Sequence, residues 1–339
     1  MPLSSKEKKI LKSIVVASEN DPQKPEFPPE SPKFPATPTF QIEVPGFSNV
    51  WLKDESINPT GTHKDRMAWE IVVTYRDFLL AKKRGLVKEL PHMSLISSGS
   101  AAIAIQSMLR KYGLPRLKVL AGNSLSKNTV NAMRRIGCRI YLTDLGKKPL
   151  AGNEILLLTQ NKGGLDITSS ESLGPTTRFY DWMSYEIINS SLDYCFIPFG
   201  TGNLYENILN INKKEVTGKE HDPRFSGKTD ILRNCNFIGA TTNNSKSKAE
   251  KLFSPHLPFK HFNEQWIRFY RDSGFCGKES SVHILNEKFL NEAIGLAETQ
   301  GINCEPSGIA GLAMLLQMKN KLPKNRKMLV VNTGKTKYP

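Results

Sequence analysis

The chain has 339 residues, of which 39% are hydrophobic and 23% charged, a composition typical of a folded protein that excludes a fully disordered one. A chain of this length can bury a substantial core, either in one large domain or in two coupled ones. The 47 Lys and Arg against 32 Asp and Glu give a formal net charge of +15, which is compatible with an affinity for anions.

The basic residues are dispersed along the sequence, without a run of five, an Arg-rich helix face or an aromatic-basic motif that would bind RNA. We therefore expect a solvated basic surface and no nucleic-acid partner. No apolar run reaches the roughly 18–20 residues that cross a bilayer, so we expect no membrane partner either.

Five widely spaced cysteines form no Cys-x-x-Cys pair, which indicates reduced thiols and neither a disulfide framework nor a metal site. The only apolar stretch near the start, residues 14–17, is too short for a secretory signal. These two observations predict a cytoplasmic location.

Seven prolines in a polar context within residues 20–38 predict an extended segment, and we interpret residues 1–36 as a proline-rich N-terminal arm. After it, short apolar runs alternate with amphipathic segments, and glycines such as Gly85 and Gly137 mark helix ends. This alternation predicts an α/β fold with an open parallel architecture. The expected strands are 49–52, 95–96, 117–120, 139–142, 194–198, 236–238 and 328–331. The expected helices are 65–84, 101–112, 126–136, 176–189, 203–210, 287–299 and 307–318, with 213–230 and 242–262 as loops or insertions.

Three loops follow predicted strands, where open α/β sheets bind their ligands. In the first, Asn58-Pro59-Thr60-Gly61-Thr62-His63 delivers Lys64 to the start of a helix. The positive end of a helix disfavours an ammonium group, and a neutral amine is what Schiff-base chemistry needs. Taken alone, such a lysine is more often a surface residue.

The second loop, Ser97-Ser98-Gly99-Ser100, precedes a predicted helix and offers hydroxyl and backbone N–H groups to a carboxylate, although such a loop taken alone is more often an ordinary serine cap. The third, Gly200-Thr201-Gly202-Asn203-Leu204, allows backbone to approach a phosphate closely at a helix N-terminus. It matches neither a Walker A loop nor a Gly-x-Gly-x-x-Gly fingerprint.

The order of these loops resembles the fold-type II pyridoxal-phosphate enzymes, which include threonine synthase, cysteine synthase, the serine/threonine dehydratases and the tryptophan synthase β chain. Asn58 to Arg66 is similar to the family's Asn-Pro-Thr-Gly-Ser-Phe-Lys-Asp-Arg, and the stretch from Lys127 to Gly137 resembles another segment. Glu305-Pro306-Ser307-Gly308 and Asn332-Thr333-Gly334 resemble its last two landmarks.

The resemblance implies pyridoxal 5′-phosphate as the cofactor, with Lys64 as the catalytic residue that carries it as a Schiff base. It implies that residues 200–204 hold the phosphate and that Ser97, Ser98, Gly99 and Ser100 bind the substrate carboxylate. Thr333 would place its hydroxyl at the pyridine nitrogen. A hydroxyl cannot keep that nitrogen protonated, so the ring is a weaker electron sink and elimination is favoured.

The resemblance also implies an α/β fold with two open, mainly parallel sheets flanked by helices, as in the tryptophan synthase β chain. It implies a smaller mobile domain at 85–170, a larger cofactor-binding domain at 37–84 plus 171–339, and a homodimer. The expected function is elimination or replacement at Cβ or Cγ of a small amino acid, by a lyase or transferase of amino-acid metabolism. The motifs favour threonine-synthase-like chemistry, with cysteine-synthase-like or dehydratase-like chemistry close behind.

Two residues depart from the family's pattern. Ser100 stands where asparagine usually reaches the 3′ oxygen of the cofactor, and His63 replaces the commoner phenylalanine. His63 either adds a donor to the phosphate or is a packed aromatic substitute. The alternative hypothesis is a cofactor-binding but catalytically altered family member that acts through protein interaction, as the Ser100 change, the arm and the charge suggest.

Overall fold

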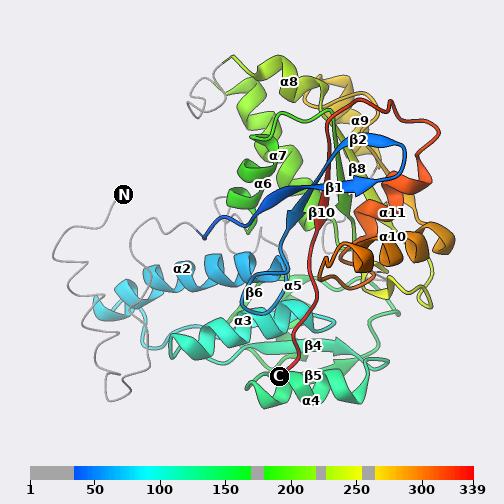
Figure 1. The fold of residues 1–339 in the computed structure, drawn as a ribbon. Helices are drawn as coiled ribbons and strands as arrows, with labels where there is room; N and C mark the ends of the chain where they lie inside the picture. The colour runs from blue at the N-terminus through cyan, green and yellow to red at the C-terminus, as the bar shows by residue number, and fades with distance from the viewer. Residues whose placement is uncertain (1–33, 169–178, 219–226, 254–263) are drawn as a thin grey trace. The chain divides into compact units, whose positions relative to one another are not determined.

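The computed structural model describes residues 34–168, 179–218, 227–253 and 264–339 (Figure 1). Most of the proline-rich arm, residues 1–33, therefore lies outside the described residues. The chain divides into two compact units: unit 1 comprises residues 1–34, 64–179 and 337–339, and unit 2 comprises 35–63 and 180–336. Each unit contains its own sheet, as the family resemblance implied.

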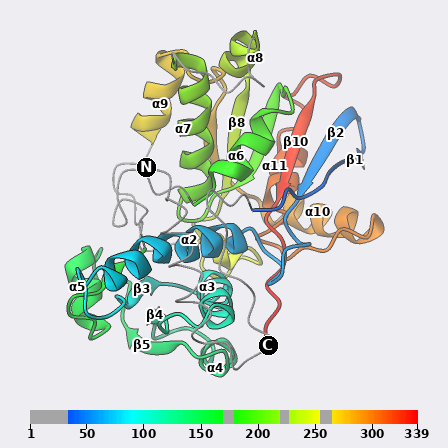
Figure 2. The ribbon, with the colours of Figure 1, turned by 90° about the vertical axis from the view of Figure 1, so that its left-hand side faces the viewer.

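Unit 2 is built on a 6-stranded sheet in the order β1-β2-β10-β7-β8-β9. β1 pairs antiparallel with β2, and every other neighbouring pair in this sheet is parallel. Helices α6 and α7 lie along one side of the sheet and α10 and α11 along the other (Figures 1 and 2). The strands are β1 (Thr39–Val44), β2 (Phe47–Asp54), β7 (Tyr194–Pro198), β8 (Asn236–Thr241), β9 (Ser281–Ile284) and β10 (Met328–Asn332). The helices are α6 (Asp181–Ile188), α7 (Asn203–Thr217), α8 (Thr229–Asn234), the 3₁₀ turn η3 (Glu250–Leu252), α9 (Glu264–Asp272), α10 (Glu287–Thr299) and α11 (Ala310–Gln317).

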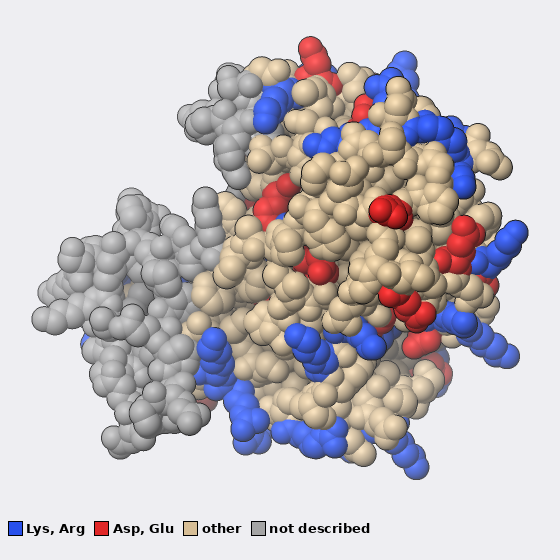
Figure 3. Space-filling model, viewed as in Figure 1, with Lys and Arg blue, Asp and Glu red and all other residues tan. Residues whose placement is uncertain are grey.

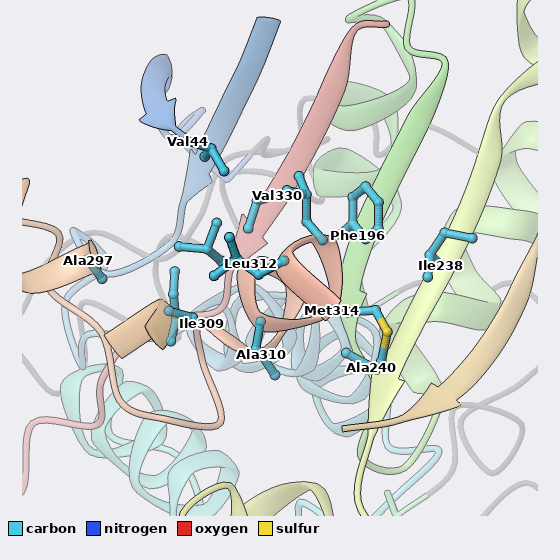
Figure 4. Packing of buried hydrophobic residues seen from close by; sticks show 14 of the residues in the cluster. Val44, Phe196, Ile238, Ala240, Ala297, Ile309, Ala310, Leu312, Met314 and Val330 are labelled. Atoms are coloured by element: carbon cyan, nitrogen blue, oxygen red, sulfur yellow. The ribbon is translucent and has the colours of Figure 1, made fainter. Parts of the chain in front are cut away.

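The core of unit 2 forms where α11 packs on the central strands (Figure 4). Leu312 and Met314 are completely buried, as are Val330 of β10 and Phe196 of β7. A side chain at Gly311 would place its Cβ 2.6 Å from the Phe196 carbonyl oxygen, so only glycine allows this close approach of helix to strand. This packing fixes β10 and β7 beside each other, and both strands lead into predicted site loops.

Unit 1 contains a 4-stranded, entirely parallel sheet in the order β5-β4-β3-β6. Helix α2 packs against α3, which groups residues 64–84 with unit 1, whereas the sequence analysis placed them in the larger domain; the domain boundaries stay a prediction. The strands are β3 (Met93–Ile96), β4 (Lys118–Gly122), β5 (Arg139–Thr143) and β6 (Leu165–Asp166). The helices are α2 (Lys64–Lys83), α3 (Ser100–Lys111), α4 (Lys127–Arg135) and α5 (Gly152–Leu158).

The structure confirms the α/β class with two mainly parallel sheets, and the predicted strands and helices in the described residues are present. The prediction of a loop at 213–230 was wrong in part, because α7 continues to Thr217 and α8 begins at Thr229, while residues 219–226 lie outside the described residues. The segment 242–262, also predicted as a loop, contains η3, and its residues 254–262 lie outside the described residues. Five other elements were not predicted from the sequence: β1, α5, β6, α9 and β9. In the described ranges no helix is long and apolar enough to cross a membrane.

Candidate active site

Three predicted site segments of unit 2 follow strands that are parallel neighbours in its sheet. The lysine turn follows β2, Thr333 follows β10, and the Gly200–Leu204 loop follows β7 after a single residue. These strands are adjacent in the order β2-β10-β7. Because parallel strands place their carboxyl ends at one edge of a sheet, segments nearly 280 residues apart in sequence begin side by side.

Glycines from three separate motifs meet backbone to backbone in this part of unit 2. A Cβ on Gly334 would lie 2.1 Å from the carbonyl oxygen of Gly61, and one on Gly308 would lie 2.2 Å from that of Gly334. Gly334 also has a φ of 95°, a conformation that favours glycine. The lysine turn, the Glu305–Gly308 loop and the segment after β10 therefore pack closely because positions 308 and 334 carry glycine.

His63, the residue before Lys64, is held against Thr333. Its backbone N–H donates to the Thr333 carbonyl oxygen at 3.1 Å, and its ring Nδ1 lies 3.4 Å from the same oxygen. The ring also packs against Tyr180, with centroids 5.4 Å apart. These contacts favour the interpretation of His63 as a packed aromatic side chain over its interpretation as a hydrogen-bond donor to the phosphate.

The Gly200–Leu204 loop has the backbone geometry that an anion cradle needs. Gly202 is the N-cap of α7 with a φ of 87°, and as glycine it offers no side chain to cap the first N–H groups of the helix. A Cβ on Gly200 would lie 3.3 Å from the carbonyl oxygen of Lys251. The Asn203 Oδ1 is buried without a hydrogen-bond partner, and such an orphan amide points to a polar group that the protein itself does not supply. A half-turn of the amide would present its Nδ2 donor at the same place.

An ion pair that the sequence did not single out ties η3 to the Glu305–Gly308 loop. The Nζ of Lys251 pairs with Oε2 of Glu305, both half-buried, and lies 3.4 Å from the hydroxyl of Thr336. Because the Lys251 backbone also borders Gly200, this pair connects the Gly200–Leu204 loop to the segment after β10. Nothing local in the sequence could have revealed it, since its partners are 54 residues apart.

The Ser97–Ser100 loop follows β3 in unit 1, and its serines have different environments. The Ser97 hydroxyl is buried and accepts the backbone N–H groups of Gly99 at 3.1 Å and Ala102 at 3.3 Å. Ser97 therefore organises the loop and caps α3, whereas Ser98 is exposed. Gly99 has a φ of 135°, which favours glycine.

Replacing Ser97 with alanine should lower the free energy of unfolding by about 1 kcal/mol, because two buried N–H groups lose their acceptor. Ser98→Ala is the matched control: its hydroxyl is exposed, so stability should not change while substrate affinity falls. Urea unfolding of the two variants tests this. Equal stability losses in both would show that Ser97 has no special structural role.

The space above Gly99 is filled by two residues that the sequence analysis did not consider. A Cβ on Gly99 would lie 2.9 Å from the Thr129 methyl group and 3.6 Å from the Tyr338 hydroxyl. Thr129 is itself fixed by the Ser126 cap of α4. Both residues belong to unit 1, so they line the loop that is predicted to receive the substrate carboxylate.

The pKa values of the cysteine thiols argue against a cysteine nucleophile at the candidate site. Burial raises the pKa of Cys138 to about 12 and that of Cys304 to about 11, and burial also raises that of Cys276. A thiol is reactive only as the thiolate, so these side chains are interior packing groups. The described residues contain no cluster of three His, Cys, Asp or Glu side chains arranged to hold a metal ion.

Glycine-rich loops at the carboxyl ends of adjacent parallel strands, beside a lysine at a helix start, define a class of cofactor-binding α/β protein. The model of a family described as "Pyridoxal-phosphate dependent enzyme" matches residues 33–334. The chain belongs to this family, and its cofactor is pyridoxal 5′-phosphate.

Curated relatives of known name share parts of the chain. A cysteine synthase of Aquifex aeolicus is 33% identical over 34% of this chain and 32% of its own length. Cysteine synthase B of Escherichia coli is 30% identical over 38% of this chain and 41% of its own length. That of Campylobacter jejuni is 27% identical over 53% of this chain and 59% of its own length. The matches therefore span between a third and three fifths of these relatives.

Solved structures match over most of the chain and show the same fold. An O-ureido-L-serine synthase is 20% identical, with a TM-score of 0.63 over 88% of this chain and 89% of that one. An O-acetylserine-dependent cystathionine β-synthase from Helicobacter pylori is 15% identical, with a TM-score of 0.62 over 88% of this chain and 92% of that one.

Proposed function

We propose that this protein catalyses replacement or elimination at Cβ of a small amino acid, in the manner of a cysteine synthase. The observation that carries the proposal is the succession of lysine turn, Thr333 and glycine loop along the adjacent strands β2, β10 and β7. The curated relatives support chemistry at Cβ, and for that reason we prefer it to threonine-synthase-like chemistry at Cγ.

The residues of the chain have distinct roles in this proposal. When bound, the cofactor withdraws electrons from Cα of the amino acid, so that its proton becomes acidic. Lys64 holds the cofactor covalently and moves the Cα proton. The backbone N–H groups of residues 200–204 and the Asn203 amide bind the phosphate. Ser98 and the N–H groups at the start of α3 bind the substrate carboxylate, while Ser97 shapes that loop.

Thr333 would influence which reaction occurs. It is buried, and its backbone is fixed on both sides, since its N–H donates to Gly308 and its carbonyl oxygen accepts from His63. A hydroxyl held there can hydrogen-bond a ring nitrogen but leaves that nitrogen without a positive charge. A weak electron sink suits a reaction in which a leaving group departs promptly from Cβ.

The decisive experiment records the absorbance spectrum of the holoenzyme with a panel of amino acids. O-acetyl-L-serine should change the cofactor spectrum and release acetate, and added sulfide should restore the spectrum as sulfur takes the place of acetate at Cβ. A response only to an amino acid with a leaving group at Cγ would overturn the proposal. A protein that holds the cofactor yet responds to no amino acid would be a catalytically altered family member.

The Ser100→Asn variant tests whether serine is a tolerated substitute. Ser100 is half-buried at the first position of α3, and an asparagine there adds a donor on a longer arm. We expect cofactor affinity and elimination to be kept or raised up to about tenfold, the value of one good hydrogen bond. Cofactor titration and acetate release measure this. A loss of both would mean that the pocket has been reshaped, since overpacking costs about 1–3 kcal/mol.

A further inference from the structure

The excess of positive charge is concentrated in unit 1. Residues 64–168 contain 18 Lys and Arg against 7 Asp and Glu, whereas the described residues of unit 2 contain 18 against 17. The stretch 90–143 has eight Lys and Arg and not one acidic residue. The charge is therefore a property of one unit and not of the chain as a whole.

The parallel topology of unit 1 gathers these residues at the amino ends of its strands. Each helix runs back against the strands, so the helix ends and loops that precede β3, β4, β5 and β6 share one edge. Hydrogen bonds join these loops: Asn161 Nδ2 donates to the His92 carbonyl oxygen at 3.0 Å, and Lys118 Nζ donates to that of Gln160 at 2.5 Å.

Eleven exposed cations lie in the four segments of this edge, 82–92, 110–118, 134–139 and 159–164, and Glu89 is the only acidic residue in them. We call them the basic edge: Lys82, Lys83, Arg84, Lys88, Arg110, Lys111, Arg116, Arg134, Arg135, Arg139 and Lys162. In Figure 3, blue side chains gather over the lower part of the face, where Figure 1 places α3, β5 and α4.

Favourable interaction with helix dipoles explains only part of the basic edge. The pairs at the ends of α2, α3 and α4 lie where cations stabilise a helix. Lys88, Arg116, Arg139 and Lys162 lie in loops or at a strand start, where this explanation does not apply. The pKa of the buried Lys118 is lowered by burial and, to a smaller extent, by the nearby charge of Arg139.

The two most exposed large apolar side chains of the described residues also lie at this edge. Leu86, in the loop after α2, is 73% exposed, and Leu157, near the end of α5, is 78% exposed. Cations precede and follow Leu86 in the sequence, and Leu158, next to Leu157, is 39% exposed as well. These leucines would not contribute to the binding of nucleic acid. An anionic bilayer interacts favourably with both the cations and the leucines, because its surface attracts cations and its interior accepts apolar side chains.

We propose that the basic edge of unit 1 docks on an anionic lipid surface, with Leu86 and Leu157 inserted beside the head groups. The Ser97–Ser100 loop lies at the opposite, carboxyl end of β3, so docking does not use the predicted substrate-binding residues. This departs from the expectations of a merely solvated charge and of no membrane partner, because the topology collects cations that are scattered in the sequence.

Sedimentation of the holoenzyme with vesicles tests the electrostatic part. We expect it to pellet with vesicles of equal parts phosphatidylserine and phosphatidylcholine, not with phosphatidylcholine alone, and to be released by salt. The double variant Arg116→Glu, Arg134→Glu should bind at least about tenfold more weakly. Lys278→Glu, Lys321→Glu is the matched control: it makes the same change of net charge on exposed lysines of unit 2 and should bind normally.

The apolar part has its own pair of variants. Leu86→Ser, Leu157→Ser should weaken vesicle binding about tenfold, while Leu142→Ser, 51% exposed near the carboxyl end of β5, should leave it unchanged. Turnover should be normal in all these variants. Absence of binding to phosphatidylserine vesicles would overturn the proposal. So would unchanged binding by the leucine variant together with tighter, salt-sensitive binding to duplex DNA, which would identify a nucleic-acid surface instead.

Discussion

The Lys64→Ala variant should lose turnover by at least about 10³-fold and bind pyridoxal phosphate only non-covalently. The amine of Lys64 is proposed both to hold the cofactor and to move the Cα proton, and loss of a positioned acid–base group alone costs about 10²–10⁴-fold. Lys64 is the first residue of α2, directly after a turn whose Gly61 packs on the Gly334 backbone, so its position is set by tertiary structure. Turnover and retention of cofactor on gel filtration measure the two losses.

Borohydride reduction identifies the lysine independently of activity. Reduction of the wild-type holoenzyme should leave a stable adduct on the peptide that contains Lys64, and the Lys64→Ala protein should yield none. Lys82→Ala, at the exposed end of the same helix, is the control and should behave as wild type. An added primary amine should restore part of the turnover of Lys64→Ala, because it replaces the missing base. An adduct on another lysine would move the catalytic centre away from this turn.

The alternation of strands and helices and the order of the motifs could be predicted from the sequence because both are local signals. The run of apolar positions after Asp65 ends at a glycine, and the structure has α2 over Lys64–Lys83. The elements that the sequence analysis missed lack such a signal. β9, Ser281–Ile284, is short and has no fully buried residue, and its place comes from pairing with β8. Tertiary pairing, not propensity, creates such a strand.

The site is harder to predict because its supports join residues that are distant in sequence. The contact of Gly61 with Gly334, and of Gly334 with Gly308, depends on the adjacency of β2 and β10, which no local pattern encodes. The role of Ser97 as an acceptor for Gly99 and Ala102 was likewise hidden, since the sequence shows only a serine before a helix. The basic edge is a third case: its charges are scattered in the sequence, and the topology of unit 1 places the helix ends that carry them together.

The Gly202→Val variant is expected to lower cofactor affinity at least tenfold while the fold persists. Gly202 has a φ of 87°, in the left-handed region that costs an L-residue about 1–2 kcal/mol and a β-branched one more. Relief of this strain would turn the first N–H groups of α7 away from the phosphate, and the new side chain would occupy the cradle itself.

Gly301→Val separates this effect from simple backbone strain. Gly301 has a similar φ of 66°, and a Cβ there would meet nothing within 4 Å, so valine brings the strain without touching the phosphate loop. Both variants should lose comparable stability in urea unfolding of the apoprotein, but only Gly202→Val should weaken binding in a cofactor titration. Pyridoxal without its phosphate should bind wild type and Gly202→Val alike, because the loop acts on the phosphate alone. Equal affinity of the two variants for pyridoxal phosphate would place the phosphate elsewhere than at the start of α7.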